Sequence, residues 1–362
     1  MAYEIKSKPE DFVVREVLGD EAALRWKDKI AIMHGRKPKE AKGGYLWMTM
    51  KKTDTGMLEA VGAIARRLGI MPDAISFSGT KDKRAVTCQT ISIRGADEER
   101  IRSLGMKGVE LSGIRQRDRP VRLGEHAGNE FSIVIRGLDR KEAARMGIGL
   151  DAVRERGMIN LFGEQRFGRS GTNAKAGCFI VKGDARGAVD ALLSGSGDAS
   201  RGYESALKRH LEDNEGDFIG ALKRVPAAVV RLLIHAYQAQ LWNSTAGELI
   251  SKGCRTQAAI PVLGYRTSMG KYPDIEEMIG RIIKKEGLRL SDFRVRLLPG
   301  FASRGSEREL LCFPKRLSYS CGEDEDVPGC MKIVAAFFLG KGSYATELIS
   351  QASRGWPDRC AP

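Results

Sequence analysis

The sequence lacks several patterns that would assign it to a common protein class. No apolar run approaches the ~18 residues of a membrane-spanning helix. The seven cysteines contain no CxxC and the four histidines no HxxxH pair, so we expect no metal site. The tripeptide Asp54-Thr55-Gly56 occurs once, whereas an aspartic protease needs two paired carboxylates. A glycine-spaced Walker loop is also missing, which disfavours a phosphate-handling enzyme.

The first residues, MAYEIKSKPEDF, carry charges and a proline in place of the apolar core of a signal peptide. We therefore expect a cytoplasmic protein. A chain of 362 residues is long for one domain and comfortable for two. The net charge of +14 favours a polyanionic partner, most often nucleic acid. Two alternatives remain: the partner is an acidic membrane surface, or the protein is basic and has no polyanionic partner.

The stretch Phe77 to Ile93, FSGTKDKRAVTCQTISI, holds the candidate chemistry. Two β-prone runs, 74–77 and 86–93, flank a polar loop from Ser78 to Arg84. Gly79 lets that loop bend, and Asp82 stands between Lys81 and Lys83. We expect these cations to keep the carboxylate ionised and to attract a polyanion. The alternative is an ordinary charged turn on the surface.

Basic clusters and one aromatic strand are further candidates. Arg36 and Lys37 begin a cationic loop with Lys39 and Lys42, and four arginines lie between positions 115 and 122. Both clusters suit phosphate contacts, although solvated loops have the same composition. Asn129 lies in a turn before the predicted strand that carries Phe131. By alternation Phe131 faces inward, and a plain core aromatic is the simpler interpretation.

The order of predicted elements indicates two domains. Strands dominate both ends of the chain, and helices dominate the middle. One helix follows Pro226 and reaches about Ile250. We therefore predict a discontinuous sheet-rich domain, 1–169 plus 301–362, that encloses a helix-rich domain, 170–300.

Six separated segments are similar to the TruD family of tRNA pseudouridine synthases, and together they cover essentially the whole chain. The most specific is GTKDKRAVTCQ, in which Asp82 takes the place of the family's invariant carboxylate. Lys6, upstream of PEDF, corresponds to its active-site basic residue, and GN-x-F includes Asn129 and Phe131. The segment 159–169, INLFGEQRFGR, contains Arg166, which could equally belong to a structural hinge. Segments 236–243 and 340–349 complete the resemblance; Trp242 stands where the family usually has Phe.

The resemblance implies an α/β (α+β) fold: a mixed-sheet pseudouridine-synthase domain with an inserted TRUD domain. It implies isomerisation of uridine to pseudouridine in tRNA without cofactor or metal. The resemblance points to uridine 13 as the target, although relatives with the same motifs modify other RNAs. Asp82 would act as nucleophile or base on the sugar, paired with Lys6, while Phe131 would stack on the flipped-out base. The remaining RNA contacts would come from Gly79, Lys81, Lys83, Asn129, Arg166, Arg36 and Lys37. A non-catalytic RNA-binding module is the alternative.

Overall fold

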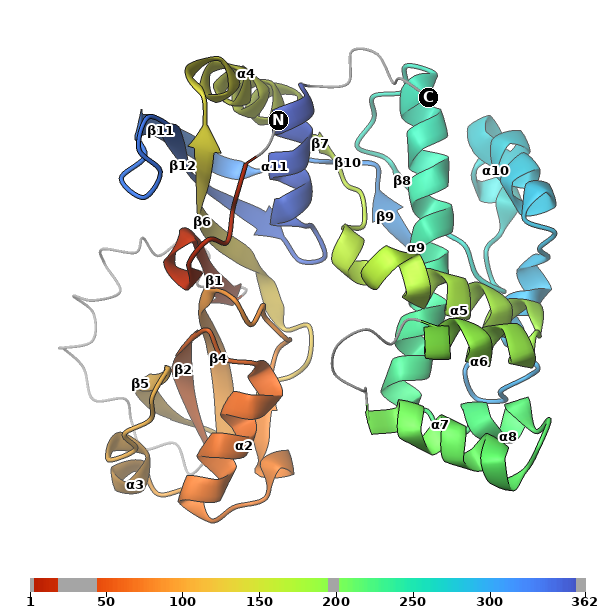
Figure 1. Ribbon diagram of the computed structural model, residues 1–362, viewed down its shortest axis with the longest axis horizontal. Helices are drawn as coiled ribbons and strands as arrows, with labels where there is room; N and C mark the ends of the chain where they lie inside the picture. The colour runs from red at the N-terminus through yellow and green to blue at the C-terminus, as the bar shows by residue number, and fades with distance from the viewer. Residues whose placement is uncertain (1–2, 19–43, 195–201, 356–362) are drawn as a thin grey trace. The chain divides into compact units, whose positions relative to one another are not determined.

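The structure is a computed structural model that describes residues 3–18, 44–194 and 202–355 (Figure 1). The chain divides into two compact units. The first comprises Met1–Gly157 with Phe313–Trp356, and the second is built from Met158–Cys312.

An eight-stranded mixed sheet forms the first unit. Its strand order is β11-β12-β6-β1-β4-β2-β5, and β3 also pairs with β4. The pair β1–β4 is parallel and all other neighbours are antiparallel. The strands are β1 (Phe12–Leu18), β2 (Tyr45–Thr53), β3 (Ile75–Phe77), β4 (Val86–Arg94), β5 (Val109–Arg117), β6 (His126–Leu138), β11 (Lys315–Glu323) and β12 (Met331–Gly340). The start and the end of the chain thus share one sheet through β6, a pairing that periodicity does not predict.

Helices α2 (Met57–Leu68), α3 (Glu98–Arg102), α4 (Arg140–Arg156) and α11 (Ala345–Arg354) pack around this sheet (Figure 1). The apolar stripe of α2 packs on Met48 and Met50 of β2 and on Ile91 and Ile93 of β4. Helices α4 and α11 approach so closely that a Cβ on Gly149 would lie 1.9 Å from the carbonyl oxygen of Ala352. Glycine at this position is therefore a requirement of helix packing.

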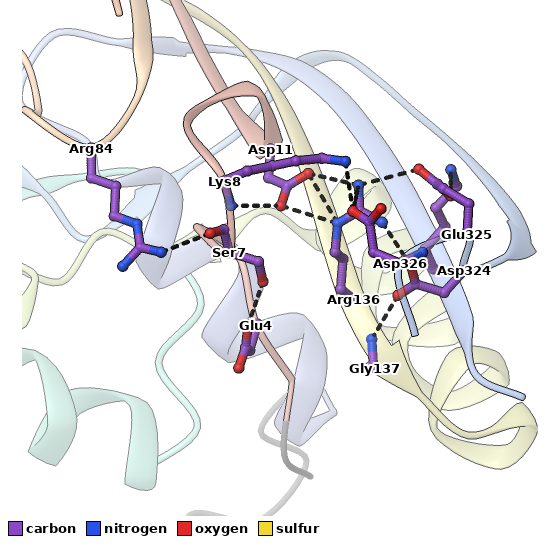
Figure 2. A network of polar contacts seen from close by, with 11 residues as sticks. Glu4, Ser7, Lys8, Asp11, Arg84, Arg136, Gly137, Asp324, Glu325 and Asp326 are labelled. Atoms are coloured by element: carbon purple, nitrogen blue, oxygen red, sulfur yellow. Dashed lines mark hydrogen bonds and ion pairs between the residues drawn. The ribbon is translucent and has the colours of Figure 1, made fainter. Parts of the chain in front are cut away.

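A buried charge cluster joins three distant parts of the first unit (Figure 2). Arg136 on β6 is 3% exposed and donates to Asp11, in the short 3₁₀ turn Pro9–Asp11, at 2.8–3.0 Å. Its other nitrogen donates to Asp324, between β11 and β12, at 2.7 Å. The hydrogen bond that Arg136 donates to Asp11 is the largest of the causes that raise the pKa of Arg136. Because an unpaired buried charge is costly, the N-terminal segment and the β11–β12 hairpin are held to β6 together.

The same cluster fixes the backbone that precedes β1. Glu4 pairs with Arg136 through both backbone hydrogen bonds, at 2.8 and 3.2 Å. Lys8 forms an ion pair of 2.6 Å with Asp326, and Arg84 donates to the carbonyl oxygen of Ser7 at 2.7 Å (Figure 2). Lys6 therefore lies in a short segment that is anchored on both sides.

The second unit is mostly helical. Its central helix is α9 (Ala227–Ser251), close to the predicted bounds, and a Cβ on Gly177 of α5 would lie 1.9 Å from the backbone of α9 at Leu233. The other helices are α5 (Thr172–Lys182), α6 (Ala185–Ser194), α7 (Gly202–Asp213), α8 (Phe218–Leu222) and α10 (Pro273–Lys285). Two short strand pairs complete it: β7 (Met158–Ile159) with β10 (Leu311–Cys312), and β8 (Ala259–Val262) with β9 (Ser306–Glu309).

The unit boundaries lie at 157/158 and 312/313, whereas the sequence placed them at 169/170 and 300/301. The difference arises because the two connecting segments pair with each other. β7 pairs with β10, and Arg308 donates to the backbone and side-chain oxygens of Asn160, both at 2.7 Å. The assignment of one unit as catalytic and the other as an insertion stays a prediction.

We predict that Arg136→Met destabilises the protein by roughly 3–5 kcal/mol, because it leaves the buried carboxylates of Asp11 and Asp324 without their cation. Arg145→Met, on the exposed surface of α4, is the control and should stay within about 0.5 kcal/mol of wild type. Urea unfolding of both variants measures the difference. Equal stability of the two would contradict a structural role for the cluster.

Candidate active site

The polar loop 78–84 connects β3 to β4, which pair in antiparallel register from Ile75↔Ile93 to Phe77↔Ile91. The two strands cover the β-prone runs predicted on either side of the loop. The loop therefore begins and ends on the sheet, and its position depends on what holds it between those points.

Three buried polar side chains from adjacent strands hold the loop. Glu16 on β1 accepts hydrogen bonds from the hydroxyl of Ser78 and from Lys81 Nζ, the latter at 2.9 Å. Gln89 on β4 donates to the carbonyl oxygen of Gly79 at 2.9 Å. Lys52 on β2 donates to the carbonyl oxygen of Asp82 at 2.6 Å. The loop is thus fixed through one residue from each of three strands.

The pair Lys81–Glu16 is almost completely shielded from water, with side chains 8% and 0% exposed. Lys81 was expected to flank the Asp82 carboxylate; its ammonium group lies instead against Glu16, beneath the loop. Lys83 lies on the exposed side, 3.4 Å from Glu59. Lys81 therefore anchors the loop, and contacts of Lys81 and Lys83 with RNA stay predictions.

Lys52 is a fully buried lysine next to the candidate catalytic residue. Burial lowers the pKa of Lys52 to about 8, an effect that Asp82 opposes and Lys81 reinforces. The folded protein therefore tolerates this ammonium group at a cost in stability. The ammonium group of Lys52 donates a hydrogen bond to the backbone carbonyl oxygen of Asp82 and so helps to fix the loop.

Asp82 and Lys6 form an ion pair of 2.9 Å between Oδ2 and Nζ, as the resemblance implies. Both side chains are partly open to solvent, 25% and 28% exposed, so a substrate can reach the carboxylate. Lys6 Nζ also lies 4.1 Å from the ring centroid of Phe12. The contact with the aromatic ring orients the ammonium group toward Asp82 from the anchored N-terminal segment.

Phe131 belongs to a cluster of three aromatic rings that begins at Phe12. Its ring contacts Phe12 edge-on, with centroids 6.2 Å apart, and stacks against Phe337 of β12 at 5.4 Å. Phe131 is only half-buried, so it is more accessible than Ile133 and Ile135 on the same strand face. Through Phe12 and Lys6 the cluster continues to Asp82.

Asn129 lies two residues before Phe131 on β6 and so shares its face of the sheet. Its Oδ1 is buried and has no hydrogen-bond partner among the described residues. A buried amide oxygen without a partner is costly, and a donor group of a substrate would satisfy it. Asn129 lies opposite Glu16 in the β1–β6 register, beside the residue that holds the loop.

The other predicted site residues are distributed over the chain. The carbonyl oxygen of Gly79 accepts a hydrogen bond from Gln89. A Cβ at position 79 would lie 3.8 Å from the ring of His126, so a larger residue would fit there without a clash. Arg166 belongs to the second unit, in a 3₁₀ turn. Arg36 and Lys37 lie outside the described residues.

Within residues 3–18, 44–194 and 202–355 no group of three or more His, Cys, Asp or Glu side chains is arranged to hold a metal ion. In the same ranges no helix has the length and apolar character needed to cross a bilayer. The expectation of a metal-free and cofactor-free reaction stays a prediction.

Sequence reasoning missed the three residues that hold the loop: Glu16, Lys52 and Gln89. Lys52 carries a detectable signal, because it continues the inward-facing series of Met48 and Met50 on β2. A charge at an inward position of a strand needs a partner and thereby points to a buried polar site. Glu16 carries the same signal after Phe12 and Val14 on β1, but its partners are more than sixty residues away and cannot be read from the sequence.

We predict that the stability of wild type relative to Lys52→Met rises with pH. The pKa of lysine is ordinarily 10.5, so between pH 8 and pH 10.5 the unfolded chain binds more protons at this site than the folded chain. Unfolding therefore becomes less favourable as pH increases. The gain should be about 2 kcal/mol between about pH 8 and about pH 9.5. Urea titrations of both proteins across this range measure it, and a difference independent of pH would exclude a strained ammonium at position 52.

Comparisons with known proteins agree on one family. The sequence model described as "tRNA pseudouridine synthase D (TruD)" matches residues 1–202, 197–259 and 246–351. The chain is 28% identical to "Probable tRNA pseudouridine synthase D" of Thermococcus sibiricus, covering 96% of this chain and 94% of the relative. It is 27% identical to the protein of the same name from Methanosarcina acetivorans, covering 96% and 91%.

The fold has a counterpart among solved structures. The crystal structure of the "Putative tRNA pseudouridine synthase D (TruD)" from Methanosarcina mazei superposes with a TM-score of 0.71 at 24% identity, covering 97% of this chain and 93% of the other. This likeness confirms the predicted α/β architecture. With the family model matching nearly the whole chain, the protein belongs to the TruD family.

Proposed function

We propose that this protein isomerises uridine to pseudouridine in tRNA and that Asp82 acts on the ribose of the target nucleotide. The observation that carries the proposal is the Lys6–Asp82 ion pair, partly open to solvent in a loop fixed by buried side chains. Membership of the TruD family supports the reaction, and the names of the relatives support tRNA as substrate.

The reaction needs one carboxylate and no redox partner. Asp82 either attacks C1′ of the ribose or takes a proton from C2′, and the C1′–N1 bond breaks with its electron pair on the uracil. The uracil then turns and C5 forms the new bond to C1′. In the first route this bond displaces Asp82 from C1′, and in the second the proton returns to C2′. The C5 proton is then released while N1 gains one. Reactant and product are isomers, so no cofactor has to supply or remove atoms or electrons.

The surroundings of Asp82 suit this chemistry. When a nucleotide displaces water, the positive charge of Lys6 at 2.9 Å stabilises the carboxylate. Phe131 offers a ring on which the flipped-out base stacks, worth about 1–3 kcal/mol. The unpaired Oδ1 of Asn129 accepts a hydrogen bond from an N–H or O–H of the nucleotide. Each contact offsets part of the few kcal/mol that base flipping costs.

Positive charges outside the site hold the RNA backbone. We assign this role to Lys83, to Arg166 and to the cationic loop that begins with Arg36 and Lys37. We expect the target to be uridine 13 of tRNA and the enzyme to act in the cytoplasm. A non-catalytic RNA-binding protein would share the charge but not the Lys6–Asp82 pair, and formation of pseudouridine separates the two functions.

We predict that Asp82→Asn removes pseudouridine formation and leaves folding and tRNA binding intact. The amide keeps the shape of the side chain but can neither attack C1′ nor accept the C2′ proton, so single-turnover yield should fall at least about a hundredfold. Melting temperature and tRNA affinity at fixed salt should match those of Asp73→Asn, an exposed control. Turnover within about tenfold of wild type would exclude Asp82 as the catalytic residue.

We predict different outcomes for two substitutions of Phe131. Phe131→Ala loses base stacking and should reduce turnover strongly, whereas Phe131→Tyr keeps the aromatic face and much of the activity. Thermal unfolding separates this effect from lost packing against Phe12 and Phe337. Equally mild effects of both variants on turnover would make Phe131 an ordinary core aromatic.

A further inference from the structure

A small cavity of about 260 Å³ on the second unit is lined by two arginines, a histidine and uncharged residues. One wall is a turn of α9, with Arg231, Ile234 and His235, and the other is the segment 300–304. Arg231 and His235 are four residues apart, so they lie on one face of the helix. Among the described residues that line this cavity, none is acidic.

The segment 300–304 is held firmly against the helix. Ser303 donates from its backbone to Phe293 and accepts from the backbone of Tyr265, at 2.9 and 3.0 Å. Its hydroxyl also bonds to Gln238 of α9 at 3.0 Å. Because these bonds fix the backbone on both sides of Ser303, the position of Arg304 at the edge of the cavity is defined before any ligand arrives.

The arginines of the cavity lack acidic partners. Elsewhere on the same unit Arg281 contacts Glu248 and Glu277, and Arg289 contacts Asp292. By contrast, within the described ranges neither Arg231 nor Arg304 forms an ion pair with a carboxylate. The guanidinium of Arg231 lies 5.3 Å from the centroid of Phe301, which orients it without neutralising it.

Arg166 adds to this charge from the loop before α5. The Nε atom of Arg166 is buried and has no hydrogen-bond partner among the described residues. His235 is exposed, yet partial loss of water around its imidazole, together with the charges of Arg166 and Arg231, lowers the pKa of His235. The cluster thus gathers three arginines around one imidazole.

We propose that Arg231, His235 and Arg304, with Arg166 beside them, form a binding site for a phosphate group of the RNA backbone. Arginine forks match phosphate oxygens in pairs, and the cavity is too small for a folded peptide but large enough for one phosphodiester. Such a contact fixes the position of the RNA and does not read its sequence. This inference rests on the proposed function, because it takes tRNA as the ligand.

The double variant Arg231→Gln/Arg304→Gln tests the site through the salt dependence of tRNA binding. Loss of two phosphate contacts should weaken binding and reduce the log–log slope by about 1.4–1.8. The control Arg281→Gln/Arg289→Gln removes the same net charge from arginines that already have acidic partners, and its slope should match wild type. Thermal unfolding confirms that both double variants fold.

Two results would overturn the proposal: equal slopes in the two double variants, or no binding of tRNA by wild type. Its failure is distinct from that of the proposed function. If wild type forms no pseudouridine but the slopes differ as stated, the phosphate site stands and the catalytic assignment fails. If wild type forms pseudouridine and the slopes agree, the site fails alone.

The pH dependence of binding provides a second readout. A bound phosphate offsets the repulsion of His235 by Arg166 and Arg231, so protonation of His235 accompanies binding. Affinity of wild type for tRNA should therefore increase from about pH 8 to about pH 6 more than that of His235→Asn. An identical increase in the two proteins would overturn the place of His235 in the site.

Discussion

The first unit depends on one buried guanidinium. Arg136 can remain in the interior only while Asp11 and Asp324 contact it, and these carboxylates come from opposite ends of the chain. Their pairing attaches the N-terminal segment and the β11–β12 hairpin to the same point on β6. Because Lys6 lies between the Glu4–Arg136 bridge and the turn that contains Asp11, the network that closes the fold also positions the cation of the candidate active site (Figure 2).

The carboxylate of the site is positioned by an independent set of contacts. Glu16, Gln89 and Lys52 reach the loop from three adjacent strands, and two of them bind backbone carbonyl oxygens. Side chains that bind the backbone fix the course of the loop and leave the carboxylate of Asp82 exposed to a substrate. Lys6 and Asp82 are thus each held before they meet, so their contact requires little further ordering when RNA binds.

The sequence predicted those parts of the fold and site that are local or carry a motif. The strands beside the loop, the helix after Pro226 and the pair Lys6–Asp82 belong to this group. It did not predict the parallel β1–β4 pairing or the role of Glu16, because both depend on residues more than sixty positions apart. Nearness in sequence also gave a wrong expectation for Lys81. It is next to Asp82 in sequence, yet its ammonium group pairs with the buried carboxylate of Glu16.

Paired and unpaired cations have different consequences for RNA binding by this protein. The net charge of +14 does not by itself locate an RNA surface, since many cations are neutralised by neighbouring acids. Arg136 and Lys52 are buried and act on protein groups, so they attract few counterions for RNA to release. Salt dependence must therefore come from exposed cations without acidic partners, such as Arg231 and Arg304. Under the two proposals, substitutions at Asp82 and at the cavity of α9 affect different measurements: turnover in the first case and salt-dependent affinity in the second.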